Sequence, residues 1–448
     1  EYMLKIFDLC SNIYYESKRK KYKMISTGSN DLPMTKIWKK LISEEIDNDL
    51  IYMWYTASGG MTVVRNIIKL YHAMLATKGN SFFSRKLDVC MTLGACQAAR
   101  IVFDYLSKEK KISEVTILGY SYSLFERECR RCNLNYYELV SHETNKNLPS
   151  VQEIINSNIK SELLILSIPS NPTGEIWSQD DFNSFLSYVK VSNKLLLIDI
   201  VGYSPISNRN NLLIDYVIRE SKIENQVYII NSFSKSDSVP AFRIGYLLGN
   251  KDVCKFASKY QFDDMMNPPI FPLLPVLFTM HTRIIFISRK YQWNINEHIY
   301  KRVFFSILRE SFALLNKQWE RKIYYIFCGH NFNRYYKSYV KEQLKNEKII
   351  IKNYNEMFRI LGKDIISYVE MQSGFNALIK LNKTKHWNEY DFCERLLKYN
   401  GLSVLTESCF TISNNKNNFW IRISMAKDKK TFKKSIIMLK KFLKSTNK

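Results

Sequence analysis

Short, uninterrupted apolar runs alternate with stretches of helical spacing through the middle of the chain, and this alternation most constrains the fold. The apolar runs are 89–92, 115–118, 163–168, 195–198 and 227–230. Residues 95–106 and 181–191, which lie between runs, have helical spacing. Strands that are apolar at every position are buried on both faces, as in a parallel sheet covered by helices. The pattern therefore predicts an α/β fold with a mostly parallel sheet and helices on both of its faces.

The chain changes character after about residue 254, where long helical sequence rich in lysine and aromatic residues begins. Mixed strand and helix patterns return near the carboxyl end, with strands expected at 374–379 and 419–423 and a helix at 390–399. We therefore expect two domains. The large one covers 46–329, with a helical insertion around 270–345, and the smaller α/β domain combines 1–45 with 330–448.

The net charge of +24, from 66 basic and 42 acidic residues, raises the question of a nucleic-acid or membrane partner. The lysines are spread along the whole chain, and only the run from Lys18 to Lys23 is dense, which favours a solvated surface. The most apolar window, 270–288, is interrupted by prolines and by Arg283. We expect neither a nucleic-acid partner nor a membrane partner.

The nine cysteines are scattered and never form two matched CxxC groups. Cys129 and Cys132 have the spacing of metal ligands, but no second pair completes a zinc site. No signal peptide is visible. These features predict reduced thiols in a cytoplasmic protein without a metal site.

Polar residues follow several of the apolar runs, at the strand ends where open α/β sheets bind ligands. Gly94, Ala95 and Cys96 open a helix whose free N–H groups and dipole suit an anion, although many helices begin with such small residues. Asn171 lies in the sequence SNPTG, where the following proline holds it extended and Gly174 permits a turn. This corner would aim the Asn171 side chain into a crevice.

A carboxylate, a lysine and an arginine follow the next two runs. Asp199 comes directly after 195–198, where an unpaired charge is costly and a protonated pyridine nitrogen would be a suitable partner. Lys235 follows 227–230, and a lysine at the mouth of such a crevice can form a Schiff base. Arg243 can direct two hydrogen bonds at a phosphate.

The motifs SNPTG (170–174), SFSKSDSVPAFRIGY (232–246) and FWIRISMA (419–426) together resemble those of the fold type I, pyridoxal-phosphate-dependent class I/II aminotransferases. The resemblance runs from about Gly28 to Ala426. It implies a large domain with a seven-stranded sheet, pyridoxal 5'-phosphate as cofactor, and a homodimer with shared active sites.

The resemblance also implies roles around the cofactor ring. Lys235 would carry the cofactor as an aldimine, Asp199 would pair with the pyridine nitrogen, and Asn171 would hydrogen-bond the phenolic oxygen. Tyr120 would stack on the ring, although a single tyrosine is more often a packing residue. Tyr203 is expected among the cofactor-binding residues, but it lies one position later after Asp199 than the family's tyrosine.

Further roles concern the phosphate and the substrate. The resemblance assigns the cofactor phosphate to Ser232, Ser234, Arg243 and the backbone of Gly94, Ala95 and Cys96. Tyr55 would reach the phosphate of the neighbouring subunit. Arg422 would clamp the substrate's α-carboxylate beside Gly28 and Asn171, whereas an arginine in a strand can also pair with a surface acid.

The implied activity is transfer of an amino group between an α-amino acid and a 2-keto acid, with Lys235 as the general base. The same first steps serve β-elimination, decarboxylation or oxygen-dependent oxidation, so a β-lyase, decarboxylase or amino-acid oxidase is the alternative. A non-catalytic regulator that binds the cofactor is a further alternative. The sequence does not identify the amino acid, and the positive charge favours an acidic co-substrate such as 2-oxoglutarate.

Overall fold

A computed structural model gives the structure of this chain. It describes residues 5, 23–26, 28, 30–47, 55–82, 87–209, 212–268, 272–312, 317–382, 387–411 and 419–445. Most of the basic run from Lys18 to Lys23 and the thiol of Cys10 lie outside these residues. Every helix within the described ranges is too short or too polar to cross a lipid bilayer.

The main sheet has seven strands in the order β2-β8-β7-β6-β5-β3-β4. Their bounds are β2 Asp88–Leu93, β3 Glu114–Leu118, β4 Asn135–Leu139, β5 Leu163–Ser167, β6 Leu195–Asp199, β7 Val227–Ser232 and β8 Ile244–Gly249. The pairs β3–β4, β3–β5 and β6–β7 are parallel, whereas β8 runs antiparallel to both β2 and β7. Every residue of β5, β7 and β8 is buried, as their apolar sequences require.

The chain forms two compact units, which we name after one residue of each. The Lys235 unit comprises Pro33–Ile112 and Trp177–Leu344, and the Arg422 unit comprises Glu1–Leu32, Ser113–Ile176 and Lys345–Lys448. The predicted domain boundaries at 46, 329 and 330 stay a prediction.

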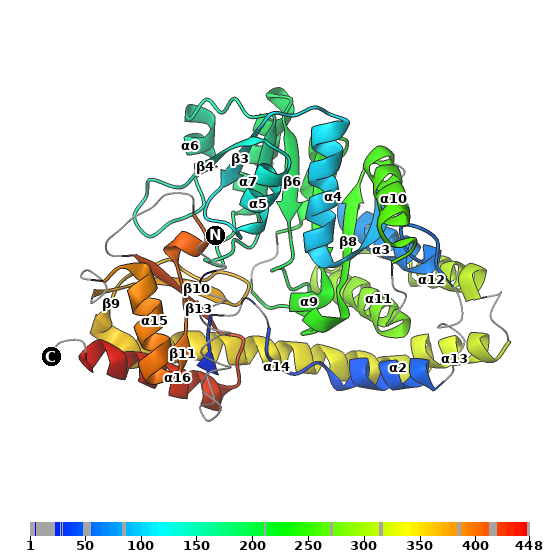
Figure 1. The fold of residues 1–448 in the computed structure, drawn as a ribbon. Coiled ribbons are helices and arrows are strands. Elements are labelled where there is room, and N and C mark those ends of the chain that lie inside the picture. Colours follow the sequence, from blue (N-terminus) through cyan, green and yellow to red (C-terminus); the bar gives the residue numbers. More distant parts are fainter. Residues whose placement is uncertain are drawn as a thin grey trace. The chain divides into compact units, whose positions relative to one another are not determined.

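The Lys235 unit contains β2, β6, β7 and β8 and most of the helices. The helices within it are α2 Lys36–Ile46, α3 Thr62–Ala76, α4 Gly94–Lys108, α7 Gln179–Val191, α8 Ile214–Ser221, α9 Phe233–Ser236, α10 Lys251–Met265, α11 Leu273–Lys290, α12 Glu297–Phe312 and α13 Lys317–Phe327, with the 3-10 turn Pro240–Phe242. Helix α4 packs on β7, β8 and α10, while α3 packs on β2, α8 and α11. Figure 1 shows α4, in cyan, beside β8 and α10.

The Arg422 unit contains β3, β4 and β5 and a second sheet in the order β12-β13-β10-β9. The remaining elements are β1 Lys23–Met24, α5 Leu124–Arg131, α6 Val151–Asn156, β9 Ile365–Tyr368, β10 Asn376–Leu381, α15 Glu389–Asn400, β11 Leu402–Ser403, β12 Leu405–Thr406, β13 Trp420–Ser424 and α16 Lys429–Ser445, with 3-10 turns at Gly362–Asp364 and Glu407–Cys409. Helix α14, Gly329–Leu361, begins in the Lys235 unit and ends in this one. The hydrophobic core of the Arg422 unit includes Met357, Phe392, Leu396, Ile421 and Ile423.

The strands predicted from the apolar runs are confirmed as β2, β3, β5, β6 and β7, and the two predicted helices as α4 and α7. Ser178 starts α7 because its side chain accepts a hydrogen bond from the backbone N–H of Asp181 at 3.0 Å. The carboxyl-terminal predictions correspond to β10, α15 and β13. The sequence did not reveal β4, because its alternating, partly exposed residues look unlike a buried strand.

Candidate active site

The carboxyl end of β6 carries Asp199, which is partly buried. Its Oδ1 accepts a hydrogen bond from the backbone N–H of Val201 at 2.9 Å. Burial raises the pKa of Asp199 to about 6, and the charge of nearby Lys235 opposes this rise. The carboxyl group therefore lies within electrostatic reach of the lysine and would be stabilised further by a bound cation.

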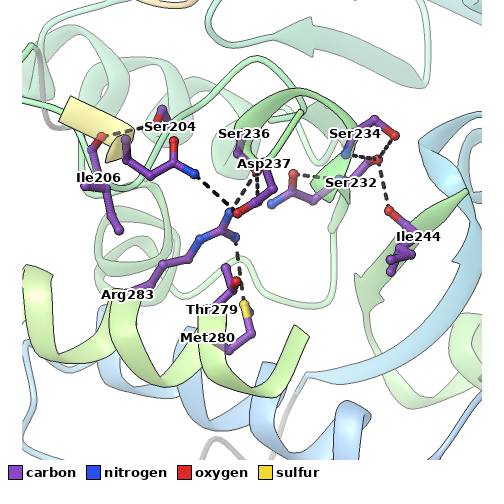
Figure 2. Close-up of polar contacts among 12 residues, drawn as sticks. Ser204, Ile206, Ser232, Ser234, Ser236, Asp237, Ile244, Thr279, Met280 and Arg283 are labelled. Carbon is purple, nitrogen blue, oxygen red and sulfur yellow. Dashed lines mark hydrogen bonds and ion pairs between the residues drawn. The ribbon is translucent and has the colours of Figure 1, made fainter. Parts of the chain in front are cut away.

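Lys235 lies one turn beyond the end of β7, in the short helix α9. Asp199 and Ile230 pair in register on β6 and β7, so the two strand ends bring the carboxyl group and the lysine to the same edge. Ser232 caps α9: its Oγ accepts from the Ser234 N–H at 3.0 Å and lies 3.0 Å from the Ile244 carbonyl oxygen (Figure 2). Lys235 is thus held on a capped, hydrogen-bonded turn.

Two glycines let the backbone of β8 approach the start of α4 closely. A Cβ added at Gly245 would lie 2.5 Å from the Gly94 Cα and 2.8 Å from the Ala95 nitrogen. No side chain caps α4 at Leu93, so its first N–H groups suit an anion. Arg243 lies at the same place and connects to the residue before α4, since its Nη2 donates to the Leu93 carbonyl oxygen at 3.1 Å.

We expect Gly245→Ala to disturb the close contact between β8 and the start of α4. The added methyl group would force β8 away from α4, which should cost about 1–3 kcal/mol of stability and weaken phosphate binding. Gly362→Ala is the control for phosphate affinity, because a Cβ there meets nothing within 4 Å; its φ of +53° makes this variant lose stability as well, so phosphate affinity is what separates the two. Urea unfolding and phosphate titration of both variants would check this, and equal phosphate affinities would contradict it.

We also expect Asp199→Asn to stabilise the cofactor-free protein at neutral pH. With a folded pKa of about 6 and an unfolded pKa of about 3.8, the native state holds more protons between these values, so stability falls as pH rises through that window. The variant should therefore exceed wild type by up to about 3 kcal/mol at pH 8 and match it below pH 4. Urea unfolding at both pH values measures this; a constant difference would contradict it.

In the Arg422 unit, Asn171 and Arg422 meet. The Arg422 Nη1 donates to the Asn171 Oδ1 at 3.0 Å, and its Nη2 donates to the Ser26 carbonyl oxygen. Asn376 also donates to the Asn171 Oδ1, at 3.2 Å. A Cβ at Gly28 would lie 3.3 Å from both terminal nitrogens of Arg422. The structure thus brings together the three residues that the sequence assigns to the substrate.

Arg422 is a buried cation with an unused donor. Only 2% of the residue is exposed, and its Nε has no hydrogen-bond partner. Burial lowers the pKa of Arg422 to about 10. Arg422 forms no ion pair with any of the described residues. Pairing with a surface acid, the alternative that the sequence left open, is therefore not seen among them. Such a group is stabilised by an incoming anion.

The chain reverses sharply at the corner that presents Asn171. Gly174 has a φ of +81°, and a Cβ there would lie 2.6 Å from the Ser373 carbonyl oxygen. Only glycine fits both the turn and this contact, as the sequence predicted for the turn.

Tyr120 follows β3 and is half-buried. Its hydroxyl donates to the Glu407 Oε1 at 2.6 Å, and its ring packs against the hydrophobic core of the Arg422 unit. Burial and the charge of Glu407 raise the pKa of Tyr120 well above its usual value. Sequence reasoning missed Glu407, which lies 287 positions away in the chain.

Two further predicted residues, Tyr203 and Tyr55, belong to the Lys235 unit. The electrostatic neighbours of Tyr203 are Tyr291, Asp215 and Arg283, and burial raises its pKa. Tyr55 is 92% exposed. Within the described ranges, no three His, Cys, Asp or Glu side chains gather in a way that could hold a metal ion. Eight cysteines of that part, Cys129 and Cys132 among them, form no disulfide bond.

Comparison with known proteins identifies a family. The family model "Aminotransferase class I and II" matches residues 23–268. A probable N-acetyl-LL-diaminopimelate aminotransferase of Bacillus subtilis (strain 168) is 27% identical over 223 residues, covering 49% of this chain and 52% of that protein. An aspartate aminotransferase of the same organism is 22% identical over 215 residues, covering 48% and 53%. The chain thus matches about half the length of these relatives.

Solved structures show the same fold along nearly the whole chain. An aminotransferase from Mycobacterium tuberculosis has a TM-score of 0.70 at 13% identity and covers 98% of this chain and 96% of its own. The aromatic aminotransferase from Pyrococcus horikoshii has a TM-score of 0.69 at 16% identity, covering 98% and 99%.

Proposed function

This chain belongs to the aminotransferase class I and II family, and we propose that it transfers an amino group between an α-amino acid and a 2-keto acid. The family depends on pyridoxal 5'-phosphate. The observation that carries the proposal is the closeness of Lys235 to the partly buried carboxyl group of Asp199, at the ends of the adjacent parallel strands β6 and β7.

The residues of the Lys235 unit fit this cofactor. Asp199 would hold the protonated pyridine nitrogen, whose positive charge would favour the ionised carboxylate, and Lys235 would bind the aldehyde carbon. Ser232, Ser234, Arg243 and the uncapped start of α4, from Gly94 to Cys96, would bind the phosphate. When bound, the cofactor supplies an electron sink for the substrate's α-carbon.

The chain's own residues account for binding and proton transfer. The unused Nε of Arg422 and its terminal nitrogens would bind the substrate's α-carboxylate, with Asn171 fixing the guanidinium. Gly28 leaves room beside these nitrogens. The Lys235 amine would take the proton from the α-carbon and return it, acting as general base and then general acid. Tyr120, held by Glu407, would stack on the cofactor ring.

A half-reaction screen tests the proposal. Purified protein loaded with pyridoxal phosphate is mixed with single amino acids, and the visible absorption band is followed. We expect one or a few amino acids to convert the band to that of the amine form and to yield the matching keto acid. Conversion by no amino acid, with ammonia, carbon dioxide or peroxide appearing instead, would favour the lyase, decarboxylase or oxidase alternatives.

We further propose a cytoplasmic homodimer with shared active sites. The exposed Tyr55 side chain supports a contact with a neighbouring subunit, and the lack of disulfide bonds among the eight cysteines of the described part supports a reducing compartment. The positive net charge supports an acidic co-substrate. Sedimentation should give twice the chain mass of 53.0 kDa, and a monomer at micromolar concentration would contradict the shared site.

A further inference from the structure

A buried ion pair between Asp237 and Arg283 holds the turn that carries Lys235. Asp237, two positions after the lysine, is 1% exposed, and Arg283 of α11 is 3% exposed. The Arg283 Nη2 lies 2.6 Å from the Asp237 Oδ2. Figure 2 shows Arg283 reaching from α11 to this turn. Neither Asp237 nor Arg283 is among the residues assigned above to the cofactor or the substrate.

Arg283 contacts α9 on both sides of Lys235. Its Nη2 also donates to the Ser236 Oγ at 2.8 Å, and Ser236 is the residue directly after the lysine. Its guanidinium carbon lies 5.1 Å from the centre of the Phe233 ring, two positions before the lysine. The planar guanidinium of Arg283 therefore contacts three residues of the turn, Phe233, Ser236 and Asp237, and fixes the position of the turn.

Asp237 is held from a second direction. Its Oδ1 accepts a hydrogen bond from the Tyr339 hydroxyl at 2.5 Å, and the Gln343 Nε2 lies 3.5 Å away. The next residue, Ser238, has a φ of +60°, a left-handed conformation that a serine adopts at a cost. The contacts of Asp237 hold the chain in this conformation.

Such a pair contributes little to stability by itself. The free energy needed to remove two charges from water is about as large as the free energy gained from their attraction. Replacing both partners by apolar residues therefore often leaves the folding stability unchanged. The pair does, however, fix one geometry, because the guanidinium is rigid and planar. The presence of this pair beside Lys235 suggests that the lysine must be held in one orientation.

We propose that Arg283 and Asp237 are positioning residues that set the Lys235 amine at the distance from Asp199 needed for attack on the cofactor aldehyde. The inference rests on the proposed function. The pair would act through α9, which its contacts hold.

The double variant Asp237→Asn/Arg283→Met tests this. It removes both charges together, so neither is left buried and unpaired, and the amide oxygen introduced at position 237 can still accept the hydrogen bond from Tyr339. We expect covalent labelling of Lys235 by pyridoxal phosphate, fixed with borohydride and located by mass spectrometry, to slow about tenfold or more. Affinity for pyridoxine 5'-phosphate, which has no aldehyde, should stay within about twofold, because the phosphate-binding groups and Asp199 are intact. A merely structural role would weaken both together.

Glu45→Gln is the matched control. Glu45 is also buried and also binds α11, since it accepts hydrogen bonds from the Leu273 and Leu274 N–H groups at its start, but it does not touch α9. This variant should label like wild type. Arg283→Lys keeps the charge without the planar fork, and it should show the same separation of labelling from binding if the double variant fails to fold.

Wild-type labelling in either folded variant, or equal losses of labelling and pyridoxine phosphate affinity, would overturn the inference. A wild-type protein that binds neither compound would instead refute the proposed function. In that case amide exchange of the cofactor-free protein decides the positioning role: exchange in 235–238 should rise about tenfold in the double variant. Unchanged exchange there would refute the role independently of the cofactor.

Discussion

Replacing Lys235 by alanine is expected to abolish the visible absorption of the protein loaded with pyridoxal phosphate and to lower the amino-transfer rate by about 10⁴-fold or more. Lys235 supplies the only amine on α9, and the same amine would move the α-proton. Asp199, Ser232 and Arg243 remain in place, so the variant should still bind the cofactor phosphate. Absorption spectra and borohydride labelling measure the first effect, and single-turnover kinetics the second.

Lys255→Ala is the control for this variant, because Lys255 is an exposed lysine of α10 in the same unit. It should leave both colour and rate unchanged. Retention of a borohydride-stable label in Lys235→Ala would show that another amine binds the aldehyde, and the assignment of Lys235 would then be wrong.

Replacing Arg422 by leucine is expected to lower kcat/KM for amino acids by about 100-fold or more. A buried guanidinium that forms two charge-assisted hydrogen bonds to a carboxylate contributes about 3–5 kcal/mol to binding, and leucine offers none. Most of the loss should appear in KM, because the carboxylate is bound in the substrate and in the transition state alike. Amines that lack the α-carboxylate should lose nothing.

The control for Arg422 is Lys380→Leu. Lys380 lies on the neighbouring strand β10, opposite Trp420, and its replacement removes one positive charge from the same sheet without disturbing Asn171. It should change kcat/KM by less than about twofold. An Arg422→Leu variant that still selects carboxylates would mean that another cation binds this group.

The sequence predicted the parts of the site that depend on local order along the chain. Asp199 follows a run of apolar residues, and Lys235 and Arg243 lie in one continuous motif, so neighbouring residues alone indicate them. The turn at Gly174 was predictable for the same reason, since glycine and proline restrict the backbone locally. Family membership, the sheet and most of its strands are confirmed.

Contacts between distant positions could not be predicted in this way. Asp237 and Arg283 are 46 positions apart, and nothing near either residue indicates the other. Glu407 reaches Tyr120 across 287 positions. The need for glycine at Gly245 is visible only once β8 is known to run antiparallel against β2, beside α4. The place of Tyr203 among Tyr291, Asp215 and Arg283 likewise depends on tertiary packing.

The fate of the amino nitrogen tests the central claim most directly. Amino acids labelled with nitrogen-15 would be incubated with the protein, pyridoxal phosphate and a mixture of 2-keto acids, and every nitrogen-containing product would be measured by mass spectrometry. Amino transfer predicts that the label appears in amino acids made from the added keto acids, with no labelled ammonia and no transfer by Lys235→Ala. Labelled ammonia without labelled product amino acids would contradict it.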